Sequence, residues 1–241
     1  MTERSFSPDR PLRLGTRGSP LAVAQAEETR ERLAAAHGLP REAFEIVPIK
    51  TTGDRVQDRA LSEIGGKGLF TKEIEEALTS GEIDLAVHSM KDMPVEQPEG
   101  LALTCYLPRE DVRDAFISLE FAGLDDLPRG AVLGSSSLRR RAQALHRRPD
   151  LQVVEFRGNV QTRLRKLADG VAAATFLACA GLRRLGMDEH AARAIAPETM
   201  LPAVAQGAIG IEQRTDDAAV TALLGAIDHA DTRQTMLAER A

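Results

Sequence analysis

Short apolar runs alternate with amphipathic stretches along most of this 241-residue chain. Between residues 69 and 80, Phe70, Ile74 and Leu78 recur at four-residue spacing, which predicts a helix with one buried face. Compact apolar runs predict strands at residues 12–16, 44–51, 83–87, 101–107, 115–119, 131–134, 151–156, 172–177 and 208–213. Strands separated by helices indicate an α/β fold with mostly parallel sheets and helices on both faces. In such sheets, ligands bind beyond the carboxyl ends of the strands.

Capping residues indicate where several helices begin and end. Ser19 is suited to cap a helix N-terminus, Pro20 to occupy its first turn and Gly38 to end it. Gly81 is placed to end the helix over 69–80. Further helices are expected up to about residue 146, up to 167, around 182 and from 216. Residues 52–68 are rich in glycine and charge and lack an apolar period, so we expect a loop there that covers a ligand site.

Basic residues recur in small-residue loops at the ends of these strands or just before helices. The five loops are Gly15-Thr16-Arg17-Gly18-Ser19-Pro20, Gly65-Gly66-Lys67-Gly68, His88-Ser89-Met90-Lys91-Asp92, Ser135-Ser136-Ser137-Leu138-Arg139-Arg140 and Arg157-Gly158-Asn159. A helix N-terminus binds anions through its free N–H groups and its dipole. Arginine adds a planar fork that matches carboxylates and phosphates. The loops therefore predict a site for an anion that carries several charges.

The composition is that of a soluble globular protein and argues against nucleic acid as a partner. Hydrophobic residues make up 43% of the chain and charged residues 28%. The chain has no Trp and one Tyr, so base-stacking platforms are absent. With 31 Lys+Arg against 36 Asp+Glu, its net negative charge also argues against a broad phosphate-tracking face. No signal-peptide region and no apolar run of roughly 20 residues is present, so we expect a cytoplasmic protein without a membrane segment.

The two cysteines and five histidines do not suggest a metal or redox centre. Cys105 and Cys179 lie far apart and are each flanked by apolar residues, so we expect two buried, reduced thiols. The histidines show no ligand spacing, and we therefore expect no metal site.

Each basic loop also has a plainer interpretation when it is considered alone. The sequence Gly65-Gly66-Lys67-Gly68 lacks the spacing of a nucleotide-binding phosphate loop and could be a flexible loop with a solvated lysine. Residues 139–141 could form a solvated helix face, and Lys91 could simply pair with Asp92 on the surface. The loop from His88 to Pro94 is more informative, because a carboxylate beside a lysine in a cleft is suited to acid catalysis or cation stabilisation.

Five longer motifs together carry a family resemblance. They are Gly66-Lys67-Gly68-Leu69-Phe70, Val87-His88-Ser89-Met90-Lys91-Asp92, Gly134-Ser135-Ser136-Ser137-Leu138-Arg139-Arg140, Arg157-Gly158-Asn159-Val160-Gln161-Thr162-Arg163 and Leu201-Pro202-Ala203-Val204-Ala205-Gln206-Gly207-Ala208. With these motifs the chain resembles the hydroxymethylbilane synthase family, also called porphobilinogen deaminases. The resemblance runs in order from about residue 12 to residue 241.

The resemblance implies a fold, a domain division and a reaction. It implies two domains of the type II periplasmic-binding-protein kind, with the active site in a cleft between them. Domain one would comprise residues 1–107 and 208–229, domain two 108–207, and 230–241 would begin a third domain. The family is a group of transferases of haem and tetrapyrrole biosynthesis that join four porphobilinogen molecules into hydroxymethylbilane and release ammonia. We therefore expect porphobilinogen as the small-molecule partner, dipyrromethane as the cofactor, and a monomer.

The resemblance also implies roles for individual residues. Asp92 matches the family's catalytic carboxylate, which holds pyrrole N–H groups and stabilises the methylene-pyrrolenine cation left when ammonia departs. Phe70 matches the aromatic residue beside the pyrrole rings. The residues that match positions for binding the acetate and propionate groups of substrate and cofactor are Arg17, Ser19, Lys67, Ser89, Lys91, Ser137, Arg139, Arg140, Arg157, Arg163 and Arg184.

Two features depart from the family pattern. Glu63 stands where members often have a lysine, so we assign no substrate role there. The cysteine that anchors the dipyrromethane would lie beyond residue 241, and neither Cys105 nor Cys179 is in its context. We therefore expect this chain to lack the cofactor-anchoring domain and to be inactive by itself. The alternative is a non-catalytic module of the same fold that binds polycarboxylates.

Overall fold

The computed structural model describes residues 6–55 and 68–241, which form two compact units. In this described part, unit 1 comprises residues 6–55, 68–110 and Gly207–Ala241, and unit 2 comprises Asp111–Gln206. The chain thus passes from unit 1 to unit 2 after Glu110 and returns after Gln206. Each unit has its own sheet and its own hydrophobic core.

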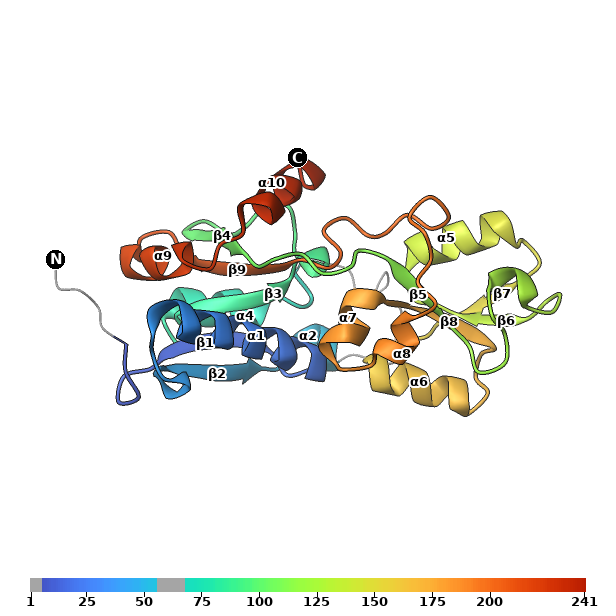
Figure 1. Ribbon diagram of the computed structural model, residues 1–241, viewed down its shortest axis with the longest axis horizontal. Helices are drawn as coiled ribbons and strands as arrows, with labels where there is room; N and C mark the ends of the chain where they lie inside the picture. The colour runs from blue at the N-terminus through green and yellow to red at the C-terminus, as the bar shows by residue number, and fades with distance from the viewer. Residues whose placement is uncertain (1–5, 56–67) are drawn as a thin grey trace. The chain divides into compact units, whose positions relative to one another are not determined.

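Unit 1 is built on a five-stranded mixed sheet with the strand order β2-β1-β3-β9-β4 (Figure 1). The strands are β1 (Leu12–Arg17), β2 (Phe44–Ile49), β3 (Leu85–Ser89), β4 (Leu101–Tyr106) and β9 (Ile209–Arg214). β1 pairs in parallel with β2 and β3, whereas β9 runs antiparallel to both β3 and β4. β9 is the strand by which the chain returns from unit 2, and it inserts between β3 and β4.

Helices cover both faces of the unit 1 sheet. The helices are α1 (Pro20–His37), α2 (Thr52–Arg55), α4 (Lys72–Ser80), α9 (Ala218–Gly225) and α10 (Ala230–Glu239), with 3-10 turns at Arg41–Ala43 and Met90–Asp92. Leu85 and Val87 of β3 pack in one core with α1 and α9, whereas Ala86 packs in a second core with Ile74 and Leu78 of α4. β3 is therefore buried on both faces, which explains its continuous apolar sequence.

Unit 2 repeats this architecture with four strands in the order β5-β8-β6-β7 (Figure 1). The strands are β5 (Asp114–Ile117), β6 (Val132–Gly134), β7 (Gln152–Val154) and β8 (Ala174–Ala178). The helices are α5 (Leu138–Arg147), α6 (Val160–Ala168), α7 (Cys179–Arg184) and α8 (Asp188–Ala191), and a 3-10 turn lies at Leu124–Asp126. β6 is parallel to β7 and β8, and β5 is antiparallel to β8. One core packs against α6, α7 and α8, and the other packs against α5.

The predicted alternation of strands and helices is confirmed, and so is the capping of α1. The Ser19 hydroxyl accepts a hydrogen bond from the Ala22 N–H at 3.2 Å, and Gly38 and Gly81 end their helices in the left-handed conformation. Strand and helix ends differ from the expected ones at several places. β3, for example, begins at Leu85 instead of residue 83, because the Ile83 N–H still donates to the Ala77 carbonyl at the end of α4.

Two predictions around the expected loop 52–68 are wrong within the described residues. The helix expected from residue 69 begins only at Lys72, because Gly68 has a φ of +86° and closes a turn with Thr71. Thr52–Arg55 is a helical turn instead of loop, and the Glu73 carboxylate holds it by accepting from the Thr52 N–H at 2.7 Å. Residues 56–67, and with them Lys67, lie outside the described part.

The C-terminal helix α10 packs within unit 1. Met236 is fully buried, and the Thr232 hydroxyl accepts from the Arg109 N–H at 3.0 Å. The Arg109 guanidinium pairs with the Glu239 carboxylate on the same helix. The expected assignment of residues 230–241 to a third domain stays a prediction.

Candidate functional site

The parallel strands bring most of the predicted site residues to one edge of each sheet. Arg17 ends β1 and Ser89 ends β3, and these two strands are parallel neighbours. In unit 2 the segments of Ser137, Arg157 and Arg184 follow β6, β7 and β8, which are also parallel. Each unit therefore carries its own group of predicted site residues beyond the carboxyl ends of its strands, as the sequence predicts for a ligand site.

In unit 1 the side chain of Arg17 lies over an aromatic ring. Its guanidinium carbon is 4.1 Å from the centre of the Phe70 ring, within the range of a cation–π contact. The ring in turn packs against Gly53 of α2, where a Cβ atom would lie 2.2 Å from it. Gly53 is therefore required for this close approach. Arg17, which the sequence predicts in a loop, and Phe70, which it predicts at the start of the helix over 69–80, are thus in contact.

The loop after β3 is held by its main chain and leaves its charged side chains exposed. The Met90 N–H donates to the Ala208 carbonyl at 3.1 Å, and the Met90 side chain is buried. Arg240, at the end of α10, donates to the Met93 carbonyl at 3.1 Å. Asp92 is exposed and forms no hydrogen bond or ion pair with any residue of the described part. The surface pair of Lys91 with Asp92, considered from the sequence, is not formed.

His88, which precedes this loop, belongs to the core. Its Nε2 lies 3.1 Å from Oε2 of Glu212 on β9, and the two side chains are 4% and 0% exposed. The other Glu212 oxygen, Oε1, has no partner among the described residues. Burial raises the pKa of Glu75 on the adjacent helix α4, and the negative charge of Glu212 adds to this effect. The pair connects β3 to β9 next to the end of β3, and the Asp92 loop follows this end along the chain.

In unit 2 the predicted arginines of α5 are paired with a buried acid. Ser137 caps α5 by accepting from the Arg140 N–H at 3.4 Å. The Arg140 guanidinium is bidentate on Asp114, with Nη2 2.6 Å from Oδ1 and Nε 3.2 Å from Oδ2. Nη2 of Arg139 lies 2.7 Å from Oδ2 of the same carboxylate. The side chain of Arg140 is only 8% exposed, compared with 23% for Arg139.

The sequence assigned no site role to Asp114 or to Gln206, although Gln206 lies in one of the family motifs. Asp114 is fully buried at the start of β5, and the Gln206 amide donates to its Oδ1 at 2.9 Å. Burial alone would raise the pKa of Asp114, but Arg140 and Arg139 outweigh it and lower the pKa to about 2. The signal that could have found Asp114 is a charged residue at the head of the apolar run Asp114-Ala115-Phe116-Ile117.

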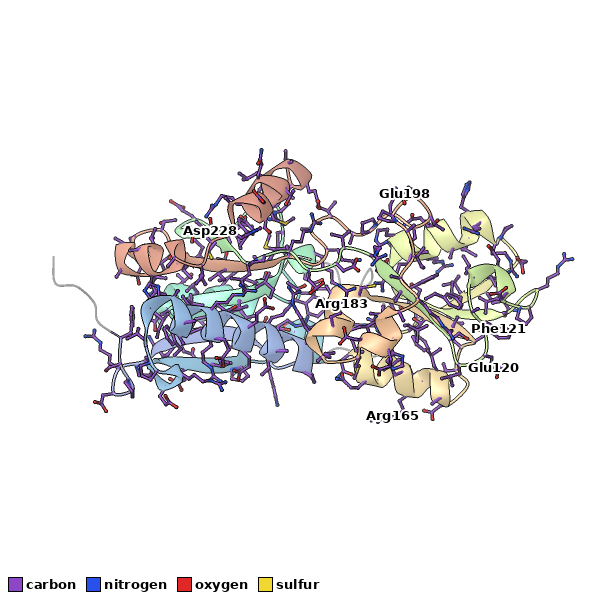
Figure 2. The ribbon with its side chains drawn as sticks, viewed as in Figure 1. Glu120, Phe121, Arg165, Arg183, Glu198 and Asp228 are labelled. Atoms are coloured by element: carbon purple, nitrogen blue, oxygen red, sulfur yellow. The ribbon has the colours of Figure 1, made fainter. Side chains whose placement is uncertain are left out.

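The remaining predicted arginines are half-buried around the start of α6 and the end of α7. Asn159 caps α6 by accepting from the Thr162 N–H at 2.8 Å, and Nε of Arg163 donates to the Gly158 carbonyl at 2.9 Å. The Lys166 ammonium donates to the Arg157 carbonyl at 3.0 Å, so both contacts shape the loop that carries Arg157. Arg184 ends α7. Its neighbour Arg183, which Figure 2 labels, pairs with Asp111 at 3.2 Å.

Other features of the described residues do not add to this site. Both cysteines are buried and free, and burial raises the pKa of Cys105 to about 12 and of Cys179 to about 11. No group of three or more His, Cys, Asp or Glu in the described ranges could hold a metal ion. No helix in that part of the chain is long and apolar enough to span a membrane.

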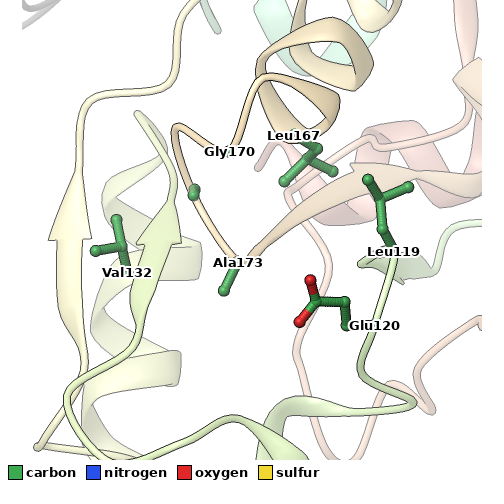
Figure 3. A pocket seen from close by; sticks show the side chains of 7 residues that line it. Leu119, Glu120, Val132, Leu167, Gly170 and Ala173 are labelled. Atoms are coloured by element: carbon green, nitrogen blue, oxygen red, sulfur yellow. The ribbon is translucent and has the colours of Figure 1, made fainter.

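A pocket of about 310 Å³ lies at the opposite edge of the unit 2 sheet (Figure 3). It is lined by Val132 at the start of β6, by Ala173 just before β8 and by residues around the end of α6. Glu120 is the charged residue of its lining. An apolar pocket with a carboxylate does not attract a polyanion, so we do not include it in the site.

The comparison with known protein families supports the resemblance. A family model described as "Porphobilinogen deaminase, dipyromethane cofactor binding domain" matches residues 12–222. The chain is 68% identical to a porphobilinogen deaminase of Paracoccus denitrificans over 97% of this chain and 75% of the relative. It is 59% identical to a chloroplastic porphobilinogen deaminase of Oryza sativa over 95% of this chain and 64% of the relative. It thus spans about two thirds to three quarters of the length of these relatives.

Solved structures that resemble this chain share its fold at low sequence identity, so they inform on the fold alone. The methionine-binding protein MetQ matches with a TM-score of 0.51 at 15% identity, over 97% of this chain and 96% of that one. A periplasmic substrate-binding protein of an ABC transporter from Coxiella burnetii also gives 0.51 at 15% identity, over 95% and 96% of the chains. These neighbours confirm the predicted type II periplasmic-binding-protein-like fold. From the extent of the family match and the identity to its members, the chain belongs to the porphobilinogen deaminases, a transferase family of tetrapyrrole biosynthesis.

Proposed function

We propose that this chain carries the catalytic and substrate-binding residues of an enzyme that condenses four porphobilinogen molecules into hydroxymethylbilane with release of ammonia. The observation that carries the proposal is Asp92, an exposed carboxylate with no partner in the described part of the chain, at the carboxyl end of a buried central strand. A carboxylate that the protein leaves uncompensated is available to a cationic reaction intermediate.

The basic residues suit the charge of the substrate. Each porphobilinogen carries an acetate and a propionate, so a growing oligomer is a polyanion. Arg17 in unit 1 and Arg139, Arg157 and Arg163 in unit 2 supply guanidinium groups, which bind carboxylates through paired N–H donors. Phe70, already in contact with Arg17, adds an aromatic face for a pyrrole ring.

The role of Asp92 follows from the charge changes of the reaction. Loss of ammonia from porphobilinogen leaves a methylene-pyrrolenine cation. Attack by the α-carbon of the next pyrrole moves the positive charge onto that ring, and loss of its α-proton restores neutrality. Both Asp92 oxygens can accept hydrogen bonds from pyrrole N–H groups, because no described side chain occupies them. The negative charge then lies beside the positive charge as it develops. The main-chain hydrogen bond of Met90 fixes the loop that presents the carboxylate, so little reorganisation is needed.

The residues of this chain fit a dipyrromethane cofactor in their donor chemistry but not in its attachment. The same arginines suit its carboxylates, as they suit those of the substrate. The cofactor, when bound, supplies the pyrrole carbon at which oligomer growth begins. Cys105 and Cys179 are buried with raised pKa values, so neither offers a reactive thiolate for a covalent link. We infer that any covalent anchor is a residue other than these two.

The test is single-turnover ammonia release from porphobilinogen by the natural full-length protein and its Asp92 variants. Asp92→Asn keeps the size but loses the charge, and we expect a loss of about 3–4 kcal/mol of transition-state stabilisation, roughly 100- to 1000-fold in rate. Asp92→Glu should retain more activity, because the charge survives. If Asp92→Asn turned over near the parent rate, the assignment of Asp92 as the catalytic carboxylate would be wrong. If the parent protein bound porphobilinogen but released no ammonia, the alternative of a non-catalytic polycarboxylate-binding module would be favoured.

A further inference from the structure

Asp114 organises the arginines that the proposed function assigns to substrate carboxylates. Its carboxylate is buried and accepts hydrogen bonds from three side chains, those of Arg139, Arg140 and Gln206. Neither oxygen is left without a donor, since Oδ1 accepts from Arg140 and Gln206 and Oδ2 accepts from Arg139 and Arg140. None of the roles considered above for the site includes this acid.

The two arginines differ in how accessible their remaining N–H hydrogens are to a ligand. A guanidinium has five N–H hydrogens. Arg140 uses three of them, two on Asp114 and one on the Phe176 carbonyl, and its side chain is buried. Arg139 gives one Nη hydrogen to Asp114 and one to the Leu201 carbonyl, so one hydrogen remains on each Nη atom. Arg140 likewise keeps one hydrogen on each Nη atom, so exposure distinguishes the two arginines. The Arg139 side chain is 23% exposed and that of Arg140 8%, and Arg139 is therefore the arginine that can offer two donors to a ligand carboxylate.

Asp114 also sets the net charge of the group. Two guanidinium groups and one carboxylate leave one net positive charge, which suits one carboxylate of a ligand. Without Asp114, two unscreened cations would repel each other and Arg139 would turn towards solvent. An ion pair that holds a guanidinium in one orientation lowers the entropy lost when a ligand binds.

Gln206 ties this group to the chain connections. Its amide nitrogen donates to Asp114 at 2.9 Å and to the Val112 carbonyl at 2.7 Å. Val112 lies just after the chain enters unit 2, and Gln206 is the last residue before the chain leaves it. Through these two hydrogen bonds, Gln206 links Asp114 to the segment by which the chain enters unit 2 and to the segment by which it leaves.

We propose that Asp114 is a positioning residue of the substrate site, which orients Arg139 to bind one carboxylate of a polycarboxylated pyrrole, and that Gln206 holds Asp114 in place. Arg140 acts as the buried counterion that keeps Asp114 charged and fixed. The inference rests on the proposed function for its ligand, and it adds to that function a division of labour between two adjacent arginines.

The test compares porphobilinogen affinity by calorimetry in the parent protein and two variants. Asp114→Asn keeps the shape but removes the charge, and we expect at least a tenfold weaker affinity. Gln206→Met removes two hydrogen bonds without changing any charge, and we expect a threefold to tenfold loss. The matched control is Asp150→Asn, because Asp150 also binds an arginine at the end of α5, Arg148, but contacts no predicted site residue. The control should bind porphobilinogen as the parent does.

A second measurement separates positioning from stability. The NMR signals of the Arg139 guanidinium report its rotation, and we expect rotation to be faster in Asp114→Asn and in Gln206→Met than in the parent. A structural ion pair alone would change the melting temperature without changing affinity at temperatures where the variant is folded. If Asp114→Asn fails to fold, Gln206→Met decides.

The outcomes distinguish this inference from the function on which it rests. Parent-like affinity in a folded Asp114→Asn or Gln206→Met protein, or an equal loss in Asp150→Asn, would overturn the role of Asp114 and leave the proposed function intact. If the parent protein itself does not bind porphobilinogen, the proposed function fails and this inference fails with it.

Discussion

Two aspartates, one in each unit, illustrate opposite uses of the same side chain. Asp92 is exposed on the 3-10 turn after β3 and has no partner in the described part of the chain. Asp114 is fully buried at the start of β5 and accepts hydrogen bonds from two arginines and a glutamine. An acid whose charge the protein leaves open is available to a ligand, whereas an acid whose charge is compensated inside the fold orients other groups.

The Asp92 loop of unit 1 and the arginines of α5 in unit 2 are also held in place by different kinds of interaction. The Asp92 loop is fixed through its main chain, by the Met90 N–H on Ala208 and by Arg240 on the Met93 carbonyl. The arginines of α5 are fixed through a side-chain charge network in which removal of Asp114 or of Arg140 changes the pairing of a buried charge. Substitutions of the exposed side chains of the Asp92 loop should therefore affect chemistry with little effect on stability, and substitutions in the network of unit 2 should affect both.

The largest effect on stability is expected for Asp114→Ala. Removing the acid leaves Arg140 buried without a counterion, which should cost about 3–5 kcal/mol of unfolding free energy. Denaturant unfolding of both proteins measures it. Asp125→Ala is the control, because Asp125 pairs with Arg147 on the surface, where such pairs contribute about 0–1 kcal/mol. Equal losses in the two variants would remove the contrast between buried and exposed pairing.

A smaller loss of unfolding free energy is expected when the pH is lowered. Because the pKa of Asp114 is lowered to about 2 in the folded protein, its contribution is fully present above about pH 4 and is lost as the pH falls towards 2. The lowering of the pKa of Asp114 from its ordinary range corresponds to about 2 kcal/mol of unfolding free energy. Unfolding free energies of the parent and of Asp114→Asn, measured between pH 5 and pH 2, should converge at the acid end. A constant difference across this range would contradict the assignment.

Removing a helix cap should lower the unfolding free energy by about 1 kcal/mol, and each unit has a serine cap at which this can be measured. Ser19 caps α1 in unit 1 and Ser137 caps α5 in unit 2, at 3.2 and 3.4 Å from the amide nitrogens that they accept from. Replacing either by Ala should lower the unfolding free energy by about 1 kcal/mol. Thermal unfolding of the two variants is the measurement. A stability loss for Ser137→Ala far above that for Ser19→Ala would show that Ser137 also supports the arginine network.

The smallest effect on stability is expected for Asp92→Asn. The side chain is exposed and unpartnered among the described residues, so the change should stay within about 0.5 kcal/mol of the parent. A melting curve recorded on the sample used for the activity assay checks this. A clear loss of stability would mean that Asp92 has a structural role, and a loss of activity could then no longer be assigned to chemistry alone.

The sequence by itself determined the α/β class, the alternation of strands and helices, and the residues that cap α1. These features depend on local properties, namely apolar periodicity, side-chain capping and the conformational freedom of glycine, and Ser19, Gly38 and Gly81 occupy their expected places. The gathering of Arg17 and Ser89 at one sheet edge was also predictable, because parallel neighbouring strands end on the same side.

Only the tertiary structure decided which charges are compensated. The sequence reasoning treated Arg139 and Arg140 as equivalent and did not identify Asp114, which is 25 and 26 residues away along the chain. It also placed His88 with the exposed loop, although Glu212, 124 residues later, pairs with it in the core. Such pairings depend on strand register and on burial, which set the desolvation of a charge, and residues distant in sequence determine both.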